Sequence, residues 1–122
     1  MNEEAIESKT GELVRQCSPE MSGTQRRFLR SRAHHVKPLV LIGDRGLHDG
    51  VFVQIDKCLD DHELIKVKYR GASREALCEA AAAIFSKIDG QTVQIVGKIL
   101  VVYRPDSKSP RLQLPNNAQL QG

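Results

Sequence analysis

Two features of this 122-residue chain could do chemistry with an anionic partner, and the first is the segment Gly43-Asp44-Arg45-Gly46. Glycine lets a backbone approach a ligand closely, and free N–H groups at the start of a following helix favour an anion such as phosphate. Arg45 adds a guanidinium that can bind phosphate or a base. A GXXG loop before a helix is how KH-type domains clamp a nucleic-acid backbone. The alternative is an ordinary turn between a strand and a helix.

The second feature is a cationic stripe on a helix that we predict over residues 22–35. A helical wheel places five basic side chains within one arc: Arg26, Arg27, Arg30, His34 and Lys37. No acid occurs between Met21 and Asp44, so these charges have no partner along the helix. Like charges at this spacing destabilise a helix by a few tenths of a kcal/mol per pair. We interpret the stripe as a phosphate-binding surface; a solvated helix face is the alternative.

Composition and missing motifs narrow the function classes. Six cations and one acid occupy residues 21–46, whereas residues 1–20 hold two cations and five acids. The chain has no GXXXXGK[ST], GXGXXG, GXSXG or HEXXH motif, so we predict no enzyme and no cofactor. The three cysteines lack the spacing of a disulfide framework or a zinc site. Cys58 and His62 lie four residues apart, but no second pair of ligands accompanies them.

Apolar periodicity predicts the elements that must position these groups. Helical spacing occurs over residues 22–35, 49–61 and 73–88, and strand patterns occur over 39–42, 64–69, 92–96 and 99–103. Gly97-Lys98 between the last two strands is typical of a type II′ hairpin turn. The order helix, strand, helix, strand, helix, strand, strand predicts an α/β fold, a two-layer single domain with a four-stranded mixed sheet.

The folded domain should span residues 21–105, between a flexible acidic N-terminal arm at 1–20 and a polar C-terminal tail at 106–122. No apolar run approaches the ~18–20 residues that a membrane helix needs, so we expect no membrane partner. The arm has no apolar stretch typical of a secretory signal. With the odd cysteine count, this favours a reducing, cytoplasmic compartment.

Five segments, in order along residues 21–105, resemble the CRM domain, the chloroplast RNA splicing and ribosome maturation family, in its stand-alone bacterial YhbY-like form. They are TQRRFLR at 24–30, AHHVKP at 33–38, the 43–46 loop with Leu47, HELIKVK at 62–68, and a hairpin from VGK at 96–98 to VYRP at 102–105. The resemblance implies an RNA-binding module whose fold is similar to the C-terminal domain of bacterial translation initiation factor three. It also implies association with precursors of the large ribosomal subunit and a role in their maturation.

The resemblance also implies which residues contact RNA. The family's loop and neighbouring basic surface carry over to Gly43, Asp44, Arg45 and Gly46, and to Arg26, Arg27, Arg30 and Lys37. The chain departs from the family pattern at Asp44, where members often carry lysine or a small polar residue. A carboxylate repels phosphate, which shifts the expected contacts toward Arg45 and the helix.

Two other hypotheses stay open beside ribosome assembly. The domain could be a protein-interaction module that docks on a ribosomal protein through its sheet. Alternatively, it could regulate messenger RNA at translation initiation. In each case we expect a monomer.

Overall fold

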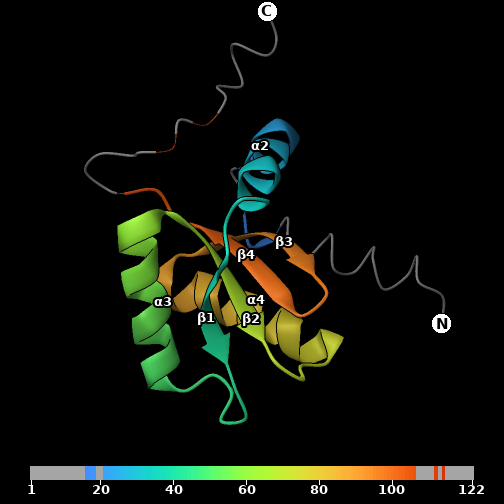
Figure 1. The fold of residues 1–122 in the computed structure, drawn as a ribbon, viewed down its shortest axis with the longest axis vertical. Coiled ribbons are helices and arrows are strands. Elements are labelled where there is room, and N and C mark those ends of the chain that lie inside the picture. The colour runs from blue at the N-terminus through green and yellow to red at the C-terminus, as the bar shows by residue number, and fades with distance from the viewer. Residues whose placement is uncertain (1–15, 19–20, 107–111, 113, 115–122) are drawn as a thin grey trace, which may run out of the picture.

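The computed structural model describes residues 16–18, 21–106, 112 and 114. Its elements follow in the predicted order (Figure 1): α2 (Gly23–Ala33), β1 (Pro38–Ile42), α3 (Asp49–His62), β2 (Leu64–Tyr69), α4 (Arg74–Ile88), β3 (Gln91–Val96) and β4 (Ile99–Tyr103). The predicted sequence of elements is therefore confirmed. None of the helices in this part of the chain is long and apolar enough to cross a membrane.

The four strands form one mixed sheet in the order β1-β2-β4-β3, as predicted. β1 runs parallel to β2, and the other two pairings are antiparallel. The turn between β3 and β4 places Gly97 at φ 58°, whereas Lys98 keeps a negative φ. Positive φ at the first turn residue alone suits a type II′ turn, which explains why glycine stands first.

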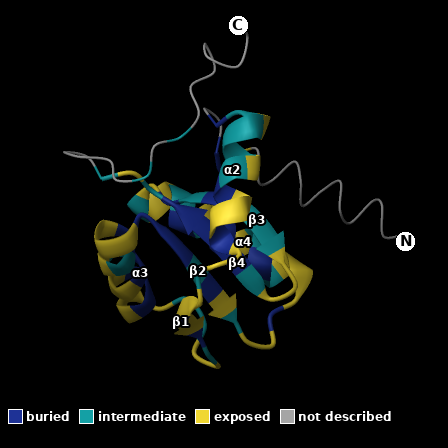
Figure 2. Ribbon diagram, turned by 45° about the horizontal axis from the view of Figure 1, so that its top comes forward, coloured by how far each residue is buried: buried dark blue, intermediate teal, exposed yellow. Residues whose placement is uncertain are grey.

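Helices cover both faces of the sheet. On β2, Ile65 and Val67 face the core under α3 and α4, whereas Leu64 faces a second core under α2. Leu29 and Ala33 of α2 pack into that second core. The prediction had two layers; α2 adds a third layer over part of the sheet because apolar side chains project from both faces. Figure 2 shows the buried parts of the strands in dark blue.

A capping box starts α2, as the order of residue types in Ser22-Gly23-Thr24-Gln25 predicts. The Ser22 hydroxyl accepts the Gln25 N–H at 3.1 Å, and the Gln25 side chain accepts the Ser22 N–H at 3.0 Å. The helix ends at Ala33, two residues before the predicted end, because the following N–H groups bond three residues back. The Val36 N–H, for example, donates to the Ala33 carbonyl at 3.0 Å. Lys37 therefore lies beyond the helix, and a helical wheel does not describe its position.

Arg104 joins the end of β4 to both helices on the other face. Its Nη1 lies 2.6 Å from Asp56 Oδ1 and donates to the Ile88 carbonyl at 2.8 Å. Its Nη2 lies 2.8 Å from Asp60 Oδ1. These contacts neutralise the guanidinium, so Arg104 is a cation of the fold rather than of a binding surface.

Candidate nucleic-acid interface

The loop between β1 and α3 is a tight turn that exposes its two charged residues. The Gly46 N–H donates to the Gly43 carbonyl at 3.0 Å, which leaves Asp44 and Arg45 exposed at the tip. Gly46 has φ 68°, and a Cβ on it would lie 3.4 Å from Tyr69 Oη. Gly43 has no positive φ. The turn therefore requires the second glycine, while the first leaves the backbone open to close approach.

The backbone N–H groups at the start of α3 are poorly placed to bind an anion. The His48 side chain caps the helix and accepts the Gly50 N–H at 3.2 Å. Asp49 then places a carboxylate in the first turn. The Gly50 N–H is therefore not available to an anion, and the adjacent Asp49 carboxylate repels one. Positive charge near the loop comes from side chains rather than from the helix dipole.

Two further cations gather at the loop end of the sheet. A Cβ built on Gly43 would lie 3.6 Å from Arg70 Nη2, so the Arg70 guanidinium stands beside the first glycine. The Lys98 carbonyl accepts the Tyr69 N–H at 2.8 Å, which brings the β3–β4 turn to the same end. Arg45, Arg70 and Lys98 therefore belong to segments that meet at the same end of the sheet, although they lie far apart in the linear sequence.

The predicted cations of the helix divide into two groups. Arg26 turns toward the protein, where its Nη2 donates to the Ser18 carbonyl at 2.8 Å and to the Ser18 hydroxyl at 2.9 Å. This geometry gives Arg26 a role in the fold, and its contact with RNA stays a prediction. Arg27, Arg30 and Lys37 are exposed.

α2 leaves a strip of the sheet uncovered beside the loop. Side chains of paired strand residues share a face, and one row crosses all four strands: Leu41, Lys68, Ile99 and Val96. Leu41 is 51% exposed and Val96 is 52% exposed. Lys66 projects from the same face two residues nearer to α2. The strip is thus apolar with lysines along its middle.

These lysines connect the two predicted binding features. The end of α2 precedes β1 and the 43–46 loop follows it, and β1 itself spans about 13 Å at ~3.3 Å per residue. Lys66 and Lys68 lie between them, and Lys66 borders a small groove with Arg30 and His34. We call this surface the cationic face, defined by Arg30, Lys37, Arg45, Lys66, Lys68 and Arg70.

Sequence reasoning missed Lys66, Lys68 and Arg70 as site residues. The alternation of residues 64–69 places Lys66 and Lys68 on one face of the strand. It does not show which face of the sheet stays uncovered. Only the position of α2 decides that.

Among the residues that the structure describes, acidic side chains lie mainly on the opposite side of the domain. α2 and the four strands contain no aspartate or glutamate. α3 and α4 carry Asp49, Asp56, Asp60, Asp61, Glu75 and Glu79. Asp44 is the acid that adjoins the cationic face. Among the described residues, this separation leaves the cationic face with a net positive charge.

Among the described residues, metal-ligating side chains do not cluster and the three cysteine thiols are not activated. They contain no group of three or more histidine, cysteine or acidic side chains that could hold a metal ion. Burial is the main cause that raises the pKa of the Cys17, Cys58 and Cys78 thiols. A thiol with a raised pKa stays protonated at neutral pH and is a poor nucleophile.

A small α/β domain with one acid-poor, cationic face has the features of a nucleic-acid-binding module. Residues 21–104 match the family model described as the CRS1 / YhbY (CRM) domain. The chain belongs to this family, and the resemblance noted from its five segments is confirmed.

Relatives and a solved structure agree with that assignment. The chain is 44% identical over 95 residues to an "RNA-binding protein" of Haemophilus influenzae, covering 78% of this chain and 95% of the relative. It is 35% identical over 95 residues to "Probable RNA-binding protein YqeI" of Bacillus subtilis, covering 78% and 99%. The solution structure of a hypothetical protein from Staphylococcus aureus is similar with a TM-score of 0.68 at 33% identity, covering 78% and 99%.

Proposed function

We propose that this protein binds RNA and that the cationic face is the contact surface. The observation that carries the proposal is the position of Lys66 and Lys68 on the uncovered sheet, between the basic helix and the 43–46 loop. The names of the relatives in Haemophilus influenzae and Bacillus subtilis support RNA as the polyanion.

The contacts are mainly to the phosphate backbone. The described chain offers few exposed aromatic rings for base stacking, whereas the six side chains of the cationic face can each neutralise a phosphate. If all six engage, log K should fall against log[salt] with a slope of about −5 on duplex-like RNA and about −4 on single strands. An affinity that does not change with salt would overturn this mechanism.

The deciding experiment compares Lys68→Gln with the matched control Lys57→Gln, an exposed lysine of α3 on the other side of the domain. Filter binding or anisotropy with a ribosomal RNA fragment should show Lys68→Gln about three- to tenfold weaker, with a salt slope smaller by about one. Lys57→Gln should bind like the parent. Equal losses in both variants would show that net charge, rather than this face, governs binding.

We further propose that the RNA belongs to precursors of the large ribosomal subunit in the cytoplasm, where the protein acts as a monomer in their assembly. This part rests on the family resemblance. Sedimentation of the tagged protein in a sucrose gradient should show co-migration with large-subunit precursors, and crosslinking with sequencing should recover large-subunit RNA. Co-migration with small subunits would instead favour regulation of translation initiation, and binding that survives RNase treatment would favour a protein-interaction module.

A further inference from the structure

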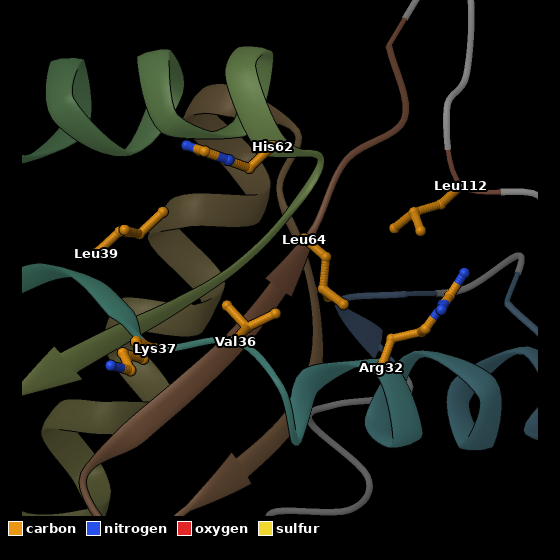
Figure 3. Close-up of a pocket in the computed structure, with 7 residues that line it drawn as sticks. All are labelled: Arg32, Val36, Lys37, Leu39, His62, Leu64 and Leu112. Atoms are coloured by element: carbon orange, nitrogen blue, oxygen red, sulfur yellow. The ribbon is translucent and has the colours of Figure 1, made fainter.

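A second concave surface lies at the other end of β1 from the 43–46 loop. It is a groove of about 400 Å³, within the ~300–1,000 Å³ of small-molecule sites. Its lining comes from the end of α2, the start of β1, the end of α3 and the C-terminal segment: Arg32, Val36, Lys37, Leu39, His62, Leu64 and Leu112. Figure 3 shows Val36 and Leu64 at the centre, Leu39 and His62 toward one end, and Arg32 with Leu112 toward the other.

The lining combines an apolar floor with positive charge. Its four apolar side chains are accompanied by arginine, lysine and histidine, and none of the described residues that line the groove is acidic. Arg32 is held in place because its guanidinium lies 5.5 Å from the centroid of the Phe28 ring. No ion pair to Arg32 occurs within the described part of the chain, so its charge is open to a ligand.

Leu112, which forms one wall of the groove, is held against the domain by a hydrogen bond and by packing. The Leu112 N–H donates to the buried carboxylate of Glu63 at 3.0 Å, and the Leu112 side chain packs against the core under α2. Glu63 directly follows His62, so one short segment supplies an end of the groove and also fixes the opposite wall.

We propose that this groove binds one unstacked nucleotide of single-stranded RNA, an inference that rests on the proposed RNA-binding function. The base lies on Leu39, Val36 and Leu64 and stacks against the His62 ring, since histidine is among the side chains on which splayed-out bases stack. The phosphate lies at Arg32, whose guanidinium points toward Leu112 at the end of the groove away from His62 in Figure 3. Such a site lets the protein favour single-stranded over duplex RNA without reading base edges.

Charge complementarity selects a nucleotide as the occupant. A purely apolar ligand would leave Arg32 and Lys37 unpaired, and a free phosphate would leave the apolar floor exposed to water. A nucleotide carries both chemistries within one unit. The groove is also continuous in charge with the cationic face, because Lys37 belongs to both.

The test titrates the full chain with uridine 5′-monophosphate and with ribose 5-phosphate, which has the same phosphate and sugar but no base. NMR should show saturable shifts at Val36, Leu39 and Leu64 with the nucleotide, and at least fivefold weaker binding of the sugar phosphate. Leu39→Ala should weaken nucleotide binding about fivefold and leave sugar phosphate binding unchanged, because only apolar area is lost. Arg32→Gln should weaken both ligands.

The matched control is Leu41→Ala. Leu39 is 43% exposed and Leu41 is 51% exposed on the same strand and face, but only Leu39 lines the groove. Equal losses in Leu39→Ala and Leu41→Ala, or equal affinity for the two ligands, would overturn the groove as a nucleotide site.

A decamer of single-stranded RNA separates the two proposals. Decamer binding that depends on Lys68, together with no mononucleotide binding, overturns the groove and leaves the proposed function standing. Mononucleotide binding in the groove without decamer binding overturns the proposed function and supports the groove.

Discussion

The side-chain carboxylate of Glu63 accepts a hydrogen bond from the backbone N–H of Leu112 at 3.0 Å, although the two residues lie 49 positions apart. The same carboxylate accepts the Asp106 N–H at 2.8 Å. Glu63 is fully buried and ends α3 with φ 63°, a backbone conformation that few non-glycine residues adopt. One buried acid therefore ties the chain that follows β4 to the end of α3.

We expect Glu63→Gln to destabilise the domain by about 1–3 kcal/mol. Glutamine keeps the size of the side chain but offers one acceptor oxygen and no charge, so one N–H loses its buried partner. Urea unfolding followed by circular dichroism measures the change. Glu79→Gln, at an exposed acid of α4, should be neutral within about 0.5 kcal/mol. Equal stability of the two variants would contradict a structural role for Glu63.

The two loop glycines should respond differently to alanine. Gly46→Ala should cost about 1 kcal/mol of folding free energy, because its φ of 68° is strained for any residue with a Cβ. Gly43→Ala should cost less than ~0.5 kcal/mol, since its nearest new contact would be the Arg70 guanidinium at 3.6 Å. If Gly43→Ala nevertheless weakens RNA binding, its role is close approach of the ligand; unchanged binding would remove that role.

Arg45→Glu should weaken RNA binding at least tenfold and leave the midpoint of thermal unfolding within about 2 °C. Arg45 is exposed at the tip of the turn, so the substitution reverses a charge without altering packing. Lys57→Glu on α3 carries the same change in net charge and should weaken binding much less. A large loss of stability in Arg45→Glu would mark the residue as structural.

The domain should lose stability in alkaline solution through Tyr103. Burial, and secondly the Glu63 charge, raise the pKa of its hydroxyl. The folded state therefore holds this proton more tightly than the unfolded chain, which releases it near pH 10. The stabilisation is complete below about pH 10 and is lost as pH rises through the folded pKa. Tyr103→Phe should flatten the decline in unfolding free energy above pH 10; an unchanged decline would assign it to other groups.

The charge of successive segments of the sequence predicted only part of the cationic face. Residues 21–46 stood out as basic, whereas the average charge over 47–103 is near zero and hid Lys66, Lys68 and Arg70. Two stretches contain no acid: residues 64–74 lie within that balanced region, and residues 90–105 begin in it and extend two residues beyond it. In the fold their strands join β1 and α2 to form one surface, while the compensating acids of α3 and α4 lie on the other side. Averaging along the chain cannot detect a separation that occurs across a sheet.

The sequence alone determined the features that depend on neighbours within about four positions. The capping box of Ser22 and Gln25, the hairpin turn at Gly97 and the order of helices and strands follow from local hydrogen bonding and side-chain periodicity. Only the tertiary structure decided that α2 covers the second face of the sheet and that Arg26 turns inward to Ser18. The same holds for the groove at Leu39, which needs Leu112. These outcomes depend on packing between segments far apart in the chain, and local periodicity carries no information about which distant segment fills which face.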